Sequence, residues 1–159
     1  MSRQYSRNIA GMINRYLTED DWHFSFDEDM GFFRFNLTLK SKIKEIRYVI
    51  SVAEDSYTVY AISPLSAETD DSAMMANMAE FICRANYGLR NGNFEMDFSD
   101  GEIRYKSFVD CEDARPSDEI ISNSIRCPAA MFSRYGDGIL AVIFNNTPAQ
   151  RAVEKCEAD

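Results

Sequence analysis

The sequence predicts an α+β fold in which helices pack on an antiparallel β-sheet, a four-strand meander joined by a separate hairpin. Between residues 22 and 61, apolar and polar residues alternate in four successive segments, the period-two pattern of half-buried strands. Apolar residues recur at helical spacing in longer segments at the N-terminus, over residues 70–87 and beyond residue 117. A charged stretch with a central Asp-Gly pair, residues 93–106, has the composition of a hairpin. We expect the 159 residues to form one domain.

The chain begins with an amphipathic helix. Its apolar stripe consists of Tyr5, Ile9, Met12, Ile13, Tyr16 and Leu17. Four strands follow, over residues 22–26, 32–40, 46–52 and 57–61.

Two turns set the predicted pairing of these strands. A two-residue turn at Glu54-Asp55 places Val52 opposite Tyr57, Ile50 opposite Val59 and Tyr48 opposite Ala61. A short loop around Lys42-Ile43 places Leu39 opposite Ile46 and continues to Phe33 opposite Val52. Both registers keep the large apolar side chains on one face, as in a meander with one buried side.

Three helices are expected in the second half of the chain. Residues 70–87 carry an apolar stripe, and Gly88 occupies the position of a C-terminal cap. The apolar spacing after Ser117 keeps its phase through Pro128, which predicts a single long kinked helix. Thr147-Pro148-Ala149-Gln150 has the pattern of a capping box that opens a short last helix.

The charged stretch of residues 93–106 could be a hairpin or a catalytic site. A turn at Asp100-Gly101 places Asp97 opposite Arg104, Glu95 opposite Lys106 and Phe98 on the core side. A carboxylate with a cation across from it stays ionised, whereas a general acid needs a raised pKa. The pairing therefore favours a hairpin, and an enzyme that uses Asp97 and Glu102 remains an alternative.

The composition disfavours several classes of partner. The formal net charge of -9 opposes binding to a phosphate backbone or to an anionic membrane surface. No apolar run approaches the roughly 20 residues of a membrane-spanning helix, and the N-terminus lacks an apolar signal core. We therefore expect a cytoplasmic protein that binds neither nucleic acid nor membrane.

The sequence indicates no metal site and no cofactor. The four cysteines lie far apart, and the one histidine, His23, has no cysteine or serine partner within its own strand. The glycine-rich stretch of residues 88–92 follows a helix and precedes a strand, the wrong order for holding phosphate at a helix N-terminus. We expect no catalytic residue in any of these places.

The stretch MAEFICRANYGLRNGNFEMDFSDGEIRYK, residues 78–106, resembles the YbjN family of bacterial proteins. The matching features are Phe81, Asn86, Tyr87, Leu89, Gly92, Phe94, Asp97, Asp100, Gly101, Ile103 and Tyr105. The Thr-Pro-Ala-Gln sequence, with Ala152 and Glu154 after it, fits the same family. The order helix, meander, helix, hairpin, helix also resembles the type III secretion chaperones.

These resemblances imply a regulatory role without established catalytic residues. The YbjN family is described as a sensory-transduction regulator, and the secretion chaperones bind effector segments as dimers. We therefore expect a non-catalytic, protein-binding regulatory or chaperone-like module, with a small-molecule sensor domain as the alternative.

Two surfaces are candidates for binding. On the polar face of the meander, Val49 lies opposite Tyr60 and Arg47 lies opposite Ile62, so a small apolar cluster meets a cation. The long helix carries a wide apolar stripe that predicts a homodimer interface. Its residues are Phe132, Tyr135, Ile139, Val142 and Ile143. Burial of this stripe under the first and last helices is the other interpretation.

Overall fold

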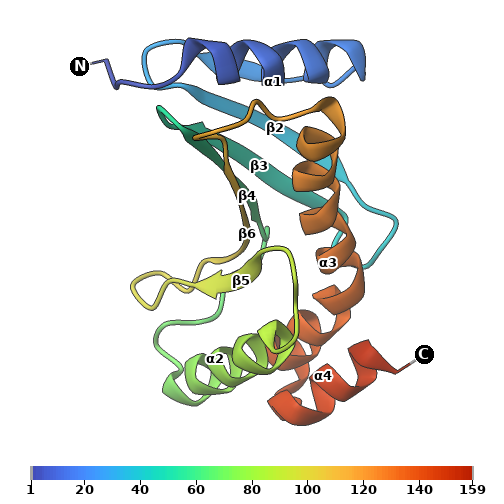
Figure 1. The fold of residues 1–159 in the computed structure, drawn as a ribbon. Helices are drawn as coiled ribbons and strands as arrows, with labels where there is room; N and C mark the ends of the chain where they lie inside the picture. Colours follow the sequence, from blue (N-terminus) through green and yellow to red (C-terminus); the bar gives the residue numbers. More distant parts are fainter. Residues whose placement is uncertain (1, 159) are drawn as a thin grey trace.

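The computed structural model describes residues 2–158, which form four helices around one six-stranded antiparallel sheet (Figure 1). The elements in chain order are α1 (Arg7–Glu19), β1 (Ser25–Asp27), β2 (Phe32–Thr38), β3 (Glu45–Val52), β4 (Ser56–Ile62), α2 (Ser72–Asn86), β5 (Asn93–Met96), β6 (Ile103–Asp110), α3 (Asp118–Asn145) and α4 (Ala149–Glu157). The strand order is β1-β2-β3-β4-β6-β5, so β6 joins the meander beside β4. The predicted α+β fold is confirmed.

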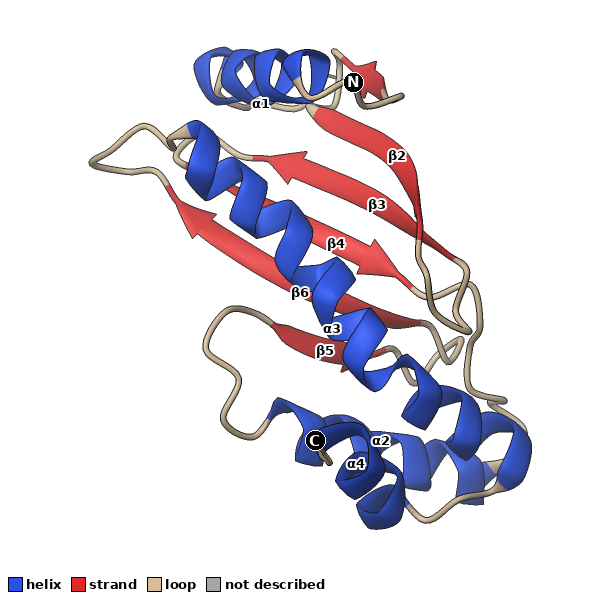
Figure 2. Cartoon of the chain, turned by 90° about the vertical axis from the view of Figure 1, so that its right-hand side faces the viewer, coloured by secondary structure: helices blue, strands red, loops and turns tan. Residues whose placement is uncertain are grey.

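The helices lie on one face of the sheet and at its ends. Helix α3 crosses the strands diagonally, α1 lies at the β1–β2 end, and α2 and α4 lie beyond β5 (Figure 2). The side chains beneath α3 alternate along β3 and β4 and are fully buried, for example Tyr48, Ile50 and Val59. The opposite face carries no helix within residues 2–158 (Figure 1).

The β3–β4 register is confirmed, and the β2–β3 register is wrong by two residues. Val52 pairs with Tyr57 as predicted, but Phe33 lies opposite Ile50. The Leu39 amide donates to the Lys44 carbonyl (2.7 Å), which makes the loop shorter than predicted. Ile43, in this loop, is buried against Gly136 of α3. A shift by two residues leaves every side chain on its original face, so alternation could not detect it.

The hairpin register is also wrong by two residues, because the turn is longer than predicted. Met96 lies opposite Ile103, and the turn closes with bonds from the Asp97 amide to the Glu102 carbonyl (3.0 Å) and from the Gly101 amide to the Asp97 carbonyl (2.7 Å). Gly101 has a φ of 75° and packs against the backbone of Ala67, whose amide donates to the Gly101 carbonyl (3.0 Å). Any side chain at Gly101 would collide with the Ala67 carbonyl, in the connection between β4 and α2. Phe98 consequently lies on the turn surface and is 64% exposed.

Helix α3 is a single helix that continues through Pro128, as predicted. The Ser117 hydroxyl caps its start by accepting from the Ile120 amide (3.2 Å). Two tyrosines reach up from the sheet near Pro128: the Tyr48 hydroxyl donates to the Ile125 carbonyl (2.6 Å), and the Tyr57 hydroxyl is bonded to that of Ser124 (3.0 Å). Burial raises the pKa of both tyrosines, that of Tyr57 to about 12, so both hydroxyls keep their protons at physiological pH.

The capping box predicted for the last helix does not form. Helix α4 begins one residue later than predicted, with Pro148 at the N-cap and no cap from its own side chains. The amide of Asn77, on α2, takes over the role: its oxygen accepts from the Ala149 amide (2.9 Å) and its nitrogen donates to the Thr147 carbonyl (2.8 Å). A cap supplied by a distant element cannot be found from local sequence.

Candidate functional site

The uncovered face of the sheet contains the four residues predicted to form a binding patch. Val49 pairs with Tyr60 and Arg47 pairs with Ile62, as expected from the β3–β4 register. Val49, Tyr60 and Ile62 are half-buried by their neighbours in the sheet, and Arg47 is exposed. The structure therefore brings these residues together on an accessible surface, and their role in binding stays a prediction.

Strand β6 enlarges this patch in a way that sequence reasoning missed. It places Phe108 beside Thr58, Lys106 beside Tyr60 and Arg104 beside Ile62. The Arg104 guanidinium lies 4.3 Å from the centroid of the Tyr60 ring, close enough for a cation–π interaction. Phe108 is 59% exposed. Because β4 and β6 are separated by a helix and a strand, nothing in the local pattern indicated that they are neighbours.

We define the open-face patch as Val49, Tyr60, Ile62 and Phe108 with the cations Arg47, Arg104 and Lys106. A hollow of about 500 Å³ lies at its β5 end, where Met96 and Phe98 are among the lining residues. A second hollow of about 480 Å³ lies at the β1–β2 end, with His23, Arg34 and Asn36 in its lining. The patch therefore continues into a depression at each end of the face.

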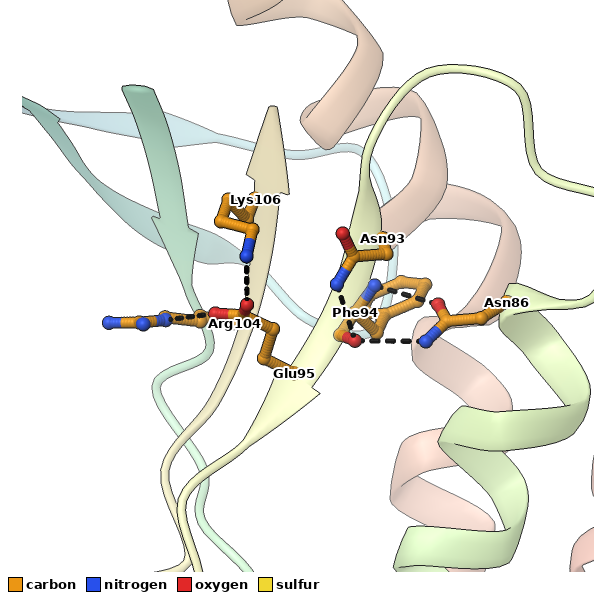
Figure 3. Close-up of polar contacts among 6 residues, drawn as sticks. All are labelled: Asn86, Asn93, Phe94, Glu95, Arg104 and Lys106. Atoms are coloured by element: carbon orange, nitrogen blue, oxygen red, sulfur yellow. Dashed lines mark hydrogen bonds and ion pairs between the residues drawn. The ribbon is translucent and has the colours of Figure 1, made fainter. Parts of the chain in front are cut away.

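A single carboxylate holds two of the patch cations in place (Figure 3). Glu95 accepts from Arg104 Nε (2.8 Å) and forms a second ion pair with Lys106. Burial by itself raises the pKa of Glu95, but the bonds from Lys106 and Arg104 together outweigh it and hold the pKa below its usual range. The cluster is consequently ionised at physiological pH.

Helix α2 fixes the strand that carries Glu95. The Asn86 amide accepts from the Phe94 amide (2.7 Å) and donates to the Phe94 carbonyl (2.9 Å), which pins β5 to the end of α2 (Figure 3). The Phe94 ring is buried edge-on against Tyr105, Phe132 and Tyr135. Backbone and side chain of Phe94 thus set the position of the next residue, Glu95.

The predicted Asp97–Arg104 pair is wrong. Arg104 lies opposite Glu95, and the Asp97 carboxylate instead accepts from the Ser99 amide (2.8 Å) inside the turn. Bonds from Ser99 hold the pKa of Asp97 below its usual value. Glu102, for which no partner was predicted, lies 3.8 Å from Arg47. The lowered pKa of Asp97 is the opposite of what a general acid needs, and Glu102 faces a cation, so this geometry gives no support to an enzyme built on Asp97 and Glu102.

Four of the five residues predicted to form a dimer interface lie in the core of the chain itself. Phe132, Tyr135, Ile139 and Val142 are each at most 1% exposed, and Ile143 is half-buried. The stripe is broad because the C-terminal half of α3 packs against α2 and α4 as well as the sheet. These four side chains are unavailable to a second copy, so we place no interface on them, and the homodimer remains a prediction without an assigned surface.

The other residues singled out from the sequence are either exposed or have a structural role. His23 is exposed, and the Asn91 carbonyl in the glycine-rich loop accepts from the buried Tyr105 hydroxyl. Among residues 2–158, no three His, Cys, Asp or Glu side chains are grouped to hold a metal ion. None of the helices in that range is both long and apolar enough to cross a membrane.

Comparisons with known proteins identify the family. A sequence profile of YbjN, described as "Putative bacterial sensory transduction regulator", matches residues 10–141. The chain belongs to the YbjN family. The family description supports a regulatory role, and the match includes the whole open-face patch but ends before α4.

A solved YbjN structure has a similar fold. The crystal structure of YbjN, "a putative transcription regulator from E. coli", aligns with a TM-score of 0.56 over 89% of this chain and 93% of that chain. The sequence identity is 9%, so this likeness concerns the fold alone. Comparison with curated proteins gave no match.

Proposed function

We propose that this YbjN-family chain is a non-catalytic regulatory module that binds an extended segment of a partner protein on the open-face patch. The observation that carries the proposal is the asymmetry of the sheet: helices cover one face, and the other presents an apolar cluster beside three cations. We place this binding in the cytoplasm. A chaperone-like role toward the bound segment is a more specific version of the same proposal.

The residue types of the patch suit a protein partner. Tyrosine, phenylalanine and arginine are enriched where proteins bind each other, and an arginine stacked on a tyrosine provides a rigid contact surface. The patch spans the neighbouring strands β3, β4 and β6, so an extended segment can contact all three. The local cations favour an aromatic segment that carries a few acidic residues, whereas the net charge of -9 on the chain opposes the continuous negative charge of a nucleic acid.

Selection from a library of random 12-residue peptides displayed on phage tests this proposal. We expect the wild-type protein to enrich extended sequences with aromatic and acidic residues. The double substitution Tyr60→Ala/Ile62→Ala should weaken a selected peptide at least tenfold in calorimetric titration, because truncation of central interface residues removes most of the contact energy.

Ile120→Ala provides the matched control. Ile120 is an exposed apolar residue on α3, 45% accessible and remote from the patch, so its removal should leave peptide affinity unchanged. Circular dichroism and thermal unfolding confirm that each variant is folded. Enrichment of the same peptides by the Tyr60→Ala/Ile62→Ala protein would show that the open-face patch is not the binding site.

A further inference from the structure

Helices α3 and α4 form a groove of about 480 Å³ that lies outside the open-face patch. The lining that bears on its chemistry comes from Lys42, Arg134, Asp137, Leu140, Phe144 and Lys155. The volume lies within the range of small-molecule sites, roughly 300–1,000 Å³.

The groove is charged at one end and mainly apolar at the other, where Asn145 is the polar residue of the lining. Arg134 and Asp137 precede Leu140, Ala141 and Phe144 along α3, and a rise of 1.5 Å per residue separates Arg134 from Phe144 by about 15 Å. Lys42 reaches the charged end from the β2–β3 loop, where its ammonium lies 3.2 Å from the Asp137 carboxylate.

Helix α4 brings Lys155 to this same charged end. The Cys156 thiol lies 3.9 Å from the Tyr135 carbonyl, so the last turn of α4 packs beside the part of α3 that carries Arg134. The opposite end of the groove holds the exposed ring of Phe144, which is 66% accessible.

Among residues 2–158, the groove lining holds three cations, Lys42, Arg134 and Lys155, and one carboxylate, Asp137. Lys42 is paired with Asp137, but within residues 2–158 neither Arg134 nor Lys155 has a carboxylate within 4.0 Å. The acidic residues of α4 do not line the groove, and their carboxylates accept hydrogen bonds from neutral groups. Glu154 accepts from Gln150 (2.9 Å) and Glu157 accepts from the Tyr135 hydroxyl (2.7 Å).

We propose that this groove binds a single small organic anion with an apolar body. Its anionic group lies between Arg134 and Lys155, and its apolar body covers Leu140 and Phe144. Charge complementarity places the head, and the separation of charged and apolar lining along α3 sets the direction of the ligand. Because the ligand contacts both helices, its binding holds α4 against α3 and stabilises the chain. The inference uses none of the open-face residues and does not depend on peptide binding.

Dodecanoate, kept below its micelle concentration, is a suitable probe because it combines a carboxylate with a long apolar chain. We expect saturable binding at one site by isothermal titration calorimetry and a higher thermal midpoint for the bound protein. Dodecyltrimethylammonium has the same chain with the opposite charge and should bind at least tenfold more weakly. Hexanoate, which is too short to reach Phe144, should also bind more weakly than dodecanoate.

Charge reversal locates the site. Arg134→Glu/Lys155→Glu should weaken dodecanoate binding at least tenfold. The matched control Arg90→Glu/Arg151→Glu makes the same change in net charge at exposed cations outside the groove lining and should bind as the wild type does. If the first variant fails to fold, Arg134→Gln/Lys155→Gln tests the same contacts with a smaller change of charge.

Four results would overturn the proposal. These are absence of saturable dodecanoate binding, equal affinity for the cationic probe, equal loss of affinity in the control variant, and binding only above the micelle concentration. The last result would indicate attraction to an assembled lipid surface instead of a site for one molecule.

Discussion

The open-face patch and the α3–α4 groove both combine cations with aromatic rings, but they leave the charges in different states. On the open face, Glu95 is bonded to Arg104 and Lys106, and Arg104 is stacked on Tyr60. In the groove, the Arg134 guanidinium lies 5.4 Å from the centroid of the Tyr135 ring, but among the described residues neither Arg134 nor Lys155 has a carboxylate within 4.0 Å. Two cations that share one carboxylate are held in fixed positions and keep one net positive charge, whereas cations without a carboxylate beside a hollow can bind an anionic group directly.

Helix α2 supports both regions in the same way, through an asparagine side chain that binds backbone groups. Asn77 binds the backbone at the start of α4, and Asn86 binds the backbone of β5. Each asparagine amide accepts one backbone hydrogen bond and donates another. The two side chains lie on one helix, so they offer a matched way to disturb either region alone.

The largest effects are expected from Asn77→Ala and Asn86→Ala. Asn77→Ala removes the side-chain partner of the Ala149 N–H and of the Thr147 carbonyl, whereas Asn86→Ala leaves the Phe94 N–H unpaired and the Phe94 carbonyl with the bond from the Asn93 side chain (3.1 Å). Each loss should cost about 1–3 kcal/mol of unfolding free energy. Asn77→Ala should speed amide exchange in α4 and weaken dodecanoate binding, whereas Asn86→Ala should speed exchange in β5 and weaken peptide binding. Urea unfolding and hydrogen exchange measure both.

Asn8→Ala is the control for this pair. Asn8 is exposed on α1, and its side chain makes no hydrogen bond among residues 2–158, so its loss should stay within about 0.5 kcal/mol. If Asn77→Ala and Asn86→Ala accelerate exchange in the same amides, the two regions form one cooperative unit and the comparison fails.

The sequence predicted the fold well because hydrophobic alternation and helical spacing are strong along most of the chain. The β3–β4 pairing was correct because the turn at Glu54-Asp55 is only two residues long and permits one register. The two registers that failed differ from the observed ones by two residues, a shift that alternation cannot detect. Burial of Ile43 and packing of Gly101 on Ala67 decide them, and both contacts are made by residues distant in sequence.

The candidate site was predictable only where it depends on adjacent strands. Val49 and Tyr60 were placed together because β3 and β4 form a hairpin, but Arg104 and Phe108 reach the same surface through a non-consecutive strand. The groove escaped prediction for a related reason. Its shape depends on how α4 docks, and the cap that positions α4 comes from Asn77.

A smaller effect is expected from Glu95→Gln, which tests whether the ion pairs of Glu95 with Arg104 and Lys106 stabilise the chain. Loss of the charge removes two half-exposed ion pairs and should cost about 1 kcal/mol. The pKa of Glu95 is lowered in the folded chain, so its contribution is present above the ordinary glutamate value of about 4.3 and is lost as the pH falls through the folded pKa.

Unfolding free energies measured by urea from pH 3 to pH 7 test this sign. The difference between wild type and Glu95→Gln should be largest near neutral pH and should shrink toward zero on acidification. Glu119→Gln is the control, because Glu119 is exposed and forms no ion pair within the described chain. A difference that grows as the pH falls would mean that Glu95 does not neutralise Arg104 and Lys106.

The smallest effect is expected from Asp97→Asn. Asp97 is exposed, and its carboxylate accepts from the Ser99 amide in the turn, a bond that the amide oxygen of asparagine can also accept. Bonds from Ser99 lower the pKa of Asp97, so the slight advantage of aspartate should exist above its ordinary pKa of about 3.9 and vanish in more acidic solution. Peptide affinity should be unchanged, because Asp97 is not paired with Arg104. A change confined to the urea midpoint would support a turn residue, whereas loss of peptide binding with the fold intact would make Asp97 part of the recognition surface.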